Sequence, residues 1–124
     1  MKYLCLVYSE EAALAAMSKS EFETFSDEHV LVDEDLKKSG HSLVAEALQP
    51  AHTATTLRVR NGRLSTTDGP FAETKEQLTG FYLVEARDLN EAIQCAARIP
   101  AARIGSIEVR PIWDLRKHEA RDWR

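Results

Sequence analysis

Apolar and polar residues alternate with the two-residue period of a β-strand in several short segments of this chain. The expected strands cover residues 2–8, 42–48, 55–60, 63–67, 80–86 and 106–112. Between them, residues 21–39 and 89–98 repeat their apolar positions with a helical period. The order strand, helix, strand, hairpin, strand, helix, strand predicts an α+β fold. It is the ferredoxin-like split βαβ pattern with an inserted β-hairpin.

Capping signals mark the ends of both expected helices. Ser20 is followed three residues later by Glu23, which is the spacing of a capping box and predicts Ser20 as the N-cap of the first helix. Gly40 is expected to end that helix, because glycine readily adopts the left-handed conformation of a C-terminal cap. Asp88, with Glu91 three residues on, is expected to cap the second helix.

The first helix carries one histidine within its apolar stripe. The stripe consists of Phe22, Phe25, Val32 and Leu36, with His29 on the same face. Two interpretations are open for His29. It is either a core histidine with a hydrogen-bond partner, or a residue that faces a cleft between the helix and the sheet.

Two of the expected strands are apolar on both faces. Tyr3, Cys5 and Val7 alternate with Leu4, Leu6 and Tyr8, and Phe81 and Leu83 alternate with Tyr82 and Val84. One layer of helices cannot bury both faces of a sheet. A second copy of the chain is the simplest cover, which predicts a homodimer in the form of a dimeric α+β barrel. The alternative is that the unassigned segments fold over this face themselves.

Composition and charge exclude several classes of protein. The chain has 124 residues, which fits one domain, and its longest apolar runs are far too short to span a membrane. No signal peptide is recognisable at the N-terminus, so we expect a cytoplasmic protein. The net charge of -4 argues against nucleic acid as a partner, because nucleic-acid binding needs a basic surface.

Neither metal nor cofactor chemistry is indicated. Cys5 and Cys95 lack a CxxC spacing and are expected to be small buried hydrophobic residues. The four histidines show no metal-ligand spacing: they are His29, His41, His52 and His118. No glycine-rich nucleotide-binding motif is present, so we expect no cofactor.

The segment Asp68–Glu76, with the sequence DGPFAETKE, is the strongest candidate for chemistry. Gly69 and Pro70 force the chain out of the sheet, and loops anchored on a rigid sheet often carry binding groups. Asp68 has two open roles. It acts as a general base, or its carboxylate accepts backbone N–H bonds in the Gly69-Pro70 turn. The segment as a whole has a plainer alternative, a solvated loop whose charges only maintain solubility.

Other charged residues are candidates to complete a cleft beside this loop. Glu73 and Lys75 lie in the loop itself, and Arg110 shares one face of the last strand with Glu108. The planar guanidinium of arginine suits a carboxylate or phosphate group, which predicts a small polar or anionic ligand. The alternative is an ion pair between Arg110 and Glu73, Glu76 or Glu85.

Three segments together resemble a known family. DGPFAETKE at residues 68–76, GFY at residues 80–82 and EVRPI at residues 108–112 resemble the DGPF branch of the YCII-related family. The resemblance runs from Met1 to about Ile112. It implies a domain of residues 1–112 followed by a charged tail, residues 113–124, which we expect to form a short helix or a flexible end.

The resemblance implies more about fold than about function. It implies a dimeric α+β barrel in a bacterial protein, often linked genetically to extracytoplasmic-function sigma factors, with no settled biochemical activity. The related YCII branch resembles a small enzyme with a proposed histidine and aspartate pair in a cleft. His29 lies on the first helix, where such a histidine falls, but its flanking residues do not match that pattern. The role is therefore not transferred.

Two hypotheses of function follow. In the first, a cleft lined by Asp68, Glu73, Lys75 and Arg110 is an enzyme site for a small polar or anionic metabolite. In the second, the dimer is a ligand-sensing or protein-interaction module connected with sigma-factor-dependent transcription, and the motif residues only shape the loop and the dimer.

Overall fold

The computed structural model describes residues 1–117. The elements, in chain order, are β1 (Lys2–Ser9), α1 (Glu11–Ala15), α2 (Lys19–Lys38), β2 (Ser42–Ala47), the short 3-10 helix η1 (Ala51–Thr53), β3 (Thr55–Arg60), β4 (Arg63–Asp68), β5 (Gln77–Glu85), α3 (Leu89–Ala96), the 3-10 helix η2 (Pro100–Arg103) and β6 (Ser106–Pro111). The predicted order of strands and helices is confirmed. No helix among these residues is both long and apolar enough to cross a membrane.

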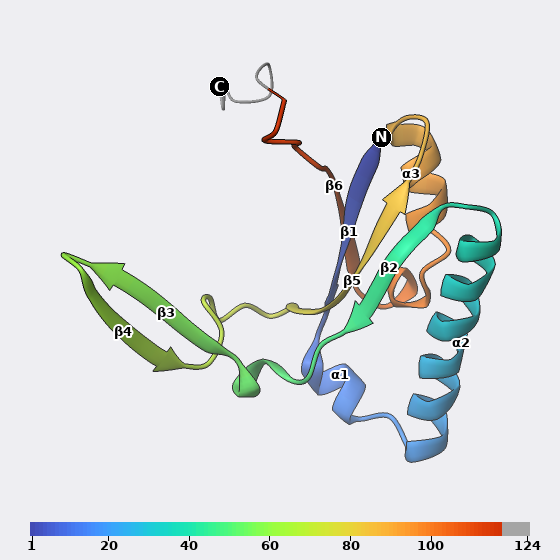
Figure 1. Ribbon diagram of the computed structural model, residues 1–124. Helices are drawn as coiled ribbons and strands as arrows, with labels where there is room; N and C mark the ends of the chain where they lie inside the picture. The colour runs from blue at the N-terminus through green and yellow to red at the C-terminus, as the bar shows by residue number, and fades with distance from the viewer. Residues whose placement is uncertain (118–124) are drawn as a thin grey trace.

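The main sheet has four antiparallel strands in the order β2-β5-β1-β6. Helices α2 and α3 lie on one side of this sheet (Figure 1). Each helix connects a central strand with an edge strand, α2 between β1 and β2, and α3 between β5 and β6. This arrangement confirms an α+β fold compatible with the ferredoxin-like pattern.

Helix α2 begins two residues earlier than predicted. Its N-cap is Ser18, whose Oγ accepts a hydrogen bond from the backbone N–H of Glu21 at 3.1 Å. The Glu21 carboxylate accepts the N–H of Ser18, also at 3.1 Å, which completes a capping box. The prediction of Ser20 as the cap was wrong because both serines have a glutamate three residues on, and the earlier pair adds further residues to the helix.

The C-terminus of α2 is closed as predicted. Gly40 has a φ of +82°, which is the left-handed conformation that glycine adopts without strain. The N–H of Gly40 donates to the Lys37 carbonyl at 3.0 Å, and the N–H of His41 donates to the Leu36 carbonyl at 2.8 Å. These two bonds form a Schellman motif, which satisfies carbonyl groups at the end of the helix.

The core lies between the helices and the sheet. Tyr3, Cys5 and Val7 of β1 are buried there with Tyr82 and Val84 of β5. Both cysteines are buried and free, as expected. Burial raises the pKa of the Cys5 thiol to about 11, so Cys5 is an uncharged core residue.

The opposite face of the sheet is also apolar but only half buried. Leu4 lies opposite Leu83, and Leu6 lies opposite Phe81, so these four side chains form adjacent cross-strand pairs. All four have intermediate exposure. The two-sided apolar character of the central strands is therefore confirmed, whereas the second copy that would cover this face remains a prediction.

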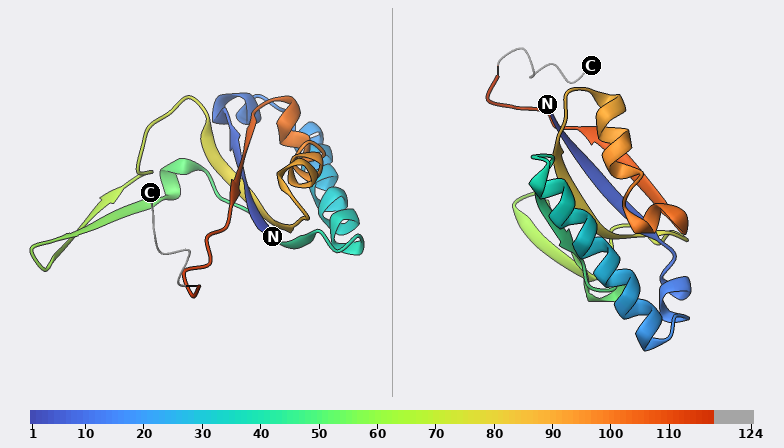
Figure 2. Two further views of the ribbon diagram at one scale, coloured as in Figure 1. Left: turned by 90° about the horizontal axis from the view of Figure 1, so that it is seen from above. Right: turned by 90° about the vertical axis from the view of Figure 1, so that its right-hand side faces the viewer.

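Strands β3 and β4 form a separate hairpin. Asn61 and Gly62 at its tip both have positive φ, 52° and 72°, as the predicted two-residue turn requires. The hairpin leaves the domain on the side of the sheet away from the helices, as Figures 1 and 2 show.

After β6 the chain turns at residues 115–117. The rest of the predicted tail, which includes His118 and Trp123, lies outside the described residues.

Candidate functional site

A cavity of about 610 Å³ lies between helix α2 and the helix-facing side of the sheet. Phe22, Phe25 and Val30 of α2 contribute much of its apolar wall, and Tyr82 of β5 contributes to the sheet side. Helix α1 and the segment from β2 to η1 also line it. Its volume falls within the range of sites for small organic molecules, and its wall is largely apolar, as in most such sites.

His29 lines this cavity and is hydrogen-bonded through both ring nitrogens. The backbone N–H of Ala101 donates to Nε2 at 3.2 Å. Nε2 must therefore be unprotonated, so the proton is on Nδ1, which donates to the Phe25 carbonyl at 2.8 Å. Burial lowers the pKa of His29 from its ordinary value, and this effect outweighs the opposing effect of the Phe25 bond. His29 is thus a neutral histidine that joins α2 to η2, and it also faces the cavity.

Asp33 lies one helical turn after His29 and lines the same cavity. Its carboxylate accepts a hydrogen bond from the Ser42 hydroxyl and pairs with Lys37 Nζ at 2.8 Å. The hydroxyl of Tyr82 donates to the His29 carbonyl at 3.2 Å. Burial raises the pKa of Tyr82 to about 12, and the negative charge of Asp33 acts in the same direction. These groups form a polar wall that is already hydrogen-bonded within the chain.

Two further acidic residues contribute to the cavity lining. Both oxygens of Glu11 accept the backbone N–H of Ala51 at 3.2 Å, which ties α1 to η1. Glu46 of β2 is the other, but it pairs with Phe81, so its side chain belongs to the face of the sheet away from the helices. Glu11 and Asp33 are the remaining acidic residues of the lining, and no lysine or arginine of the described chain contributes to it. The electrostatics of the cavity therefore favour neutral or cationic groups over anions.

The residues of the DGPF loop, the motif segment 68–76, do not line this cavity. Asp68, Glu73 and Lys75 are all exposed. The turn is held by the N–H of Gly69, which donates to the Ala54 carbonyl at 2.7 Å, and by the Thr56 hydroxyl, which donates to the Gly69 carbonyl at 2.9 Å. The Asp68 carboxylate makes no hydrogen bond with another residue of the described chain, so of its two open roles the acceptor of N–H bonds in the turn is not seen.

Arg110 lies on the half-buried face of the sheet, opposite the helices. It forms an ion pair with Glu108 on the same strand. The alternative role considered for Arg110, an ion pair with Glu73, Glu76 or Glu85, is therefore not the one seen in the single chain. Glu76 instead accepts the Ser106 hydroxyl at 2.7 Å, and Glu85 pairs with the N-terminal amino group at 3.1 Å. Within one chain, His29 and Arg110 thus lie on opposite faces of the sheet, and a role in ligand binding remains a prediction for each.

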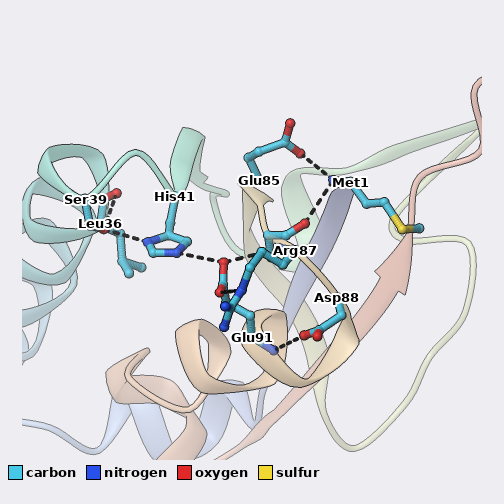
Figure 3. Close-up of polar contacts among 9 residues, drawn as sticks. Met1, Leu36, Ser39, His41, Glu85, Arg87, Asp88 and Glu91 are labelled. Carbon is cyan, nitrogen blue, oxygen red and sulfur yellow. Dashed lines mark hydrogen bonds and ion pairs between the residues drawn. The ribbon is translucent and has the colours of Figure 1, made fainter.

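A second polar cluster joins the end of α2 to the start of α3 (Figure 3). His41 lies between the Ser39 hydroxyl, 2.7 Å from Nδ1, and the Glu91 carboxylate, 3.1 Å from Nε2. Glu91 also accepts hydrogen bonds from the backbone and side chain of Arg87, and the backbone bond is the main cause that lowers the pKa of Glu91. Asp88 accepts the Glu91 N–H at 2.9 Å, as predicted for the cap of α3. This cluster fixes the two helix ends relative to each other.

Sequence reasoning raised a cleft between the first helix and the sheet as one interpretation of His29, but it did not identify Asp33 as part of it. The available signal was the spacing of four residues between His29 and Asp33, which places both on one helix face. The other lining groups come from separate elements and form no local motif.

The fold and the cavity define a small α+β domain with an apolar site under one helix. The family model of the YCII-related domain matches residues 1–116, and the chain belongs to this family. It is 40% identical over 114 residues to an uncharacterized protein of Rhizobium meliloti (strain 1021), a match that covers 90% of this chain and 92% of the relative.

Proposed function

We propose that this protein binds a small, largely apolar molecule in the cavity beneath α2. The observation that supports this proposal is the cavity of about 610 Å³, whose wall is apolar and carries a few polar groups that would orient a ligand. Its acidic lining favours a ligand with a neutral or cationic polar group. This proposal differs from the anionic ligand that Lys75 and Arg110 suggested, because neither residue lines the cavity.

Binding is favoured over acid–base catalysis by the state of His29. A general base needs a free nitrogen, but Nε2 already accepts the Ala101 N–H and Nδ1 already donates to Phe25. This observation supports the second of the two hypotheses, a ligand-sensing module. A link with sigma-factor-dependent transcription rests on the resemblance to the DGPF branch.

Thermal unfolding with three matched probes tests the proposal. 1-Naphthalenemethanol, 1-naphthylmethylamine and 1-naphthoic acid share one ring system and carry a neutral, a cationic and an anionic group. A molecule that binds only the folded state raises the melting temperature by mass action. We expect the neutral and cationic probes to raise it more than the anionic probe. Stabilisation by the anionic probe alone would refute the proposed ligand class.

A variant that fills the cavity supplies the control. Ser26 of α2 lines the cavity, and Ser26→Leu should block the site and abolish the shift produced by the probes. Thr24→Leu makes a similar change at an exposed position of α2 that does not line the cavity, and it should retain the shift. Equal shifts in both variants would show that the probes bind elsewhere.

The half-buried face of the sheet supports a homodimer. Leu4, Leu6, Phe81 and Leu83 form a continuous apolar patch there, and a second copy of the chain would bury it. We expect a dimer by sedimentation at micromolar concentration. Leu6→Asp should abolish association or folding, because the dimer would bury a charge without a partner. Monomeric wild type under these conditions would refute the dimer.

A further inference from the structure

The β3–β4 hairpin is the least buried part of the described chain. Within the two strands every residue is exposed except Thr56, which has intermediate exposure. The two strands pair with each other in a sheet of their own, separate from the main sheet. An isolated two-stranded hairpin is only marginally stable in water. A surface that packs against it would stabilise this conformation.

One face of the hairpin is apolar. Val59 lies directly opposite Leu64, and Leu57 is two residues before Val59, so the three side chains share this face. They are 61% (Leu57), 56% (Val59) and 66% (Leu64) exposed. A cluster of exposed aliphatic side chains on a projecting ribbon is typical of an interaction surface.

The other face is basic. It carries Arg58, Arg60 and Arg63, and Arg60 lies directly opposite Arg63 across the two strands. Like charges in this position repel each other. Within residues 1–117, none of the three forms an ion pair with a carboxylate, and Arg58 lies 5.9 Å from the ring centre of Phe71. The tip of the hairpin therefore presents uncompensated positive charge.

We propose that the hairpin, residues 55–68, is an arm that packs against a second copy of this chain, with Leu57, Val59 and Leu64 in contact with the partner. This inference rests on the proposed dimer. The arm projects on the same side of the main sheet as the apolar face that a partner would cover (Figures 1 and 2). The arginines lie on the opposite face of the hairpin and take no part in this contact.

The dimer dissociation constant, measured by sedimentation on the full chain, tests the arm. The double variant Leu57→Ser, Leu64→Ser removes apolar surface from exposed positions, so the fold of the main sheet is expected to persist. Loss of two contacts of this size should raise the dissociation constant by about tenfold or more. The control Ser65→Ala, Thr67→Ser changes exposed residues on the opposite face of the hairpin and should leave the constant near that of wild type.

A chemical measurement gives an independent readout. The native Cys5 and Cys95 are buried, so Leu64→Cys supplies one exposed thiol for iodoacetamide. Its alkylation should be slower above the dimer dissociation constant than below it. An exposed thiol introduced on α2 by Thr24→Cys reports whether concentration alone alters the rate.

The outcomes distinguish a failure of the proposed arm from a failure of the proposed dimer. If wild type is dimeric but the hairpin variant dissociates as wild type does, the arm is refuted and the proposed dimer is retained. If wild type is monomeric, both are refuted. A weakened dimer, together with slowed alkylation of Leu64→Cys, supports it.

Discussion

The neutral His29 predicts a specific dependence of stability on pH. Its pKa is lowered in the folded chain from the ordinary value of 6.5, so below pH 6.5 the unfolded chain takes up a proton that the folded chain resists. The stabilising contribution is complete above pH 6.5 and is lost as the pH falls through the folded pKa. Within that window one proton difference lowers the free energy of unfolding by at most about 1.4 kcal/mol per pH unit.

The substitution His29→Gln isolates this effect. Glutamine does not titrate, and its side-chain oxygen can accept the Ala101 N–H. We expect urea unfolding of His29→Gln to show a smaller loss of stability than wild type between pH 7.5 and 5. His29→Leu should instead cost about 1–3 kcal/mol at pH 7.5, because Ala101 is buried and its N–H would lose its acceptor.

The exposed His52 supplies the matched control. His52→Gln removes a histidine from the surface at η1, so its pH profile should follow that of wild type. If His29→Gln loses stability with the same slope as wild type, the assigned neutral state of His29 is wrong.

Three further predictions concern other positions. Ser18→Ala should lower the free energy of unfolding by about 1 kcal/mol through loss of the α2 cap, whereas Ser20→Ala should change it little; equal effects in urea titrations would contradict the assigned cap. Gly69→Ala should lower the free energy of unfolding by about 1 kcal/mol in the same titrations, because Gly69 has a φ of +102°, which a residue with a Cβ adopts only with strain. The added Cβ would meet no other atom, so the backbone conformation alone causes the loss, and unchanged stability would show that this conformation is not required. If Arg110 and Asp68 bind an anion, small carboxylates or phosphates should raise the melting temperature of wild type but not of Arg110→Ala or Asp68→Asn; a panel without effect on wild type would end that hypothesis.

The sequence was sufficient to predict the order of the elements, because their periods differ and their ends carry strong turn signals. Asn61-Gly62 and Gly40 were interpreted correctly, since glycine at positive φ leaves a clear local signal. The start of α2 was misplaced because Ser18 and Ser20 both satisfy the local rule, and only the path of the whole helix distinguishes them.

The candidate site was harder to predict for a physical reason. The DGPF loop is a contiguous motif and draws attention, yet Asp68, Glu73 and Lys75 are exposed to solvent in the single chain. The cavity arises from the spacing between α2 and the sheet, and its lining residues are distant in sequence. His29 was recognised as a candidate, but its two hydrogen bonds depend on the approach of η2, which no local pattern indicates.

The segment that includes the hairpin leaves the main sheet after Ala47 of β2 and rejoins it at Gln77 of β5, which pairs with Ser9 of β1. Ala47 of β2 and Gly80 of β5 are direct partners, and the N–H of Leu48 donates to the Thr79 carbonyl at 2.9 Å, so the two ends of this segment lie side by side. A Cβ on Gly80 would lie 2.9 Å from the Glu46 carbonyl oxygen, which shows how closely the strands approach there. The length and surface of this insertion can therefore change between relatives while the pairing of β2 with β5 is preserved. A change confined to the tip of the hairpin therefore leaves both the main sheet and the residues that line the cavity unaltered.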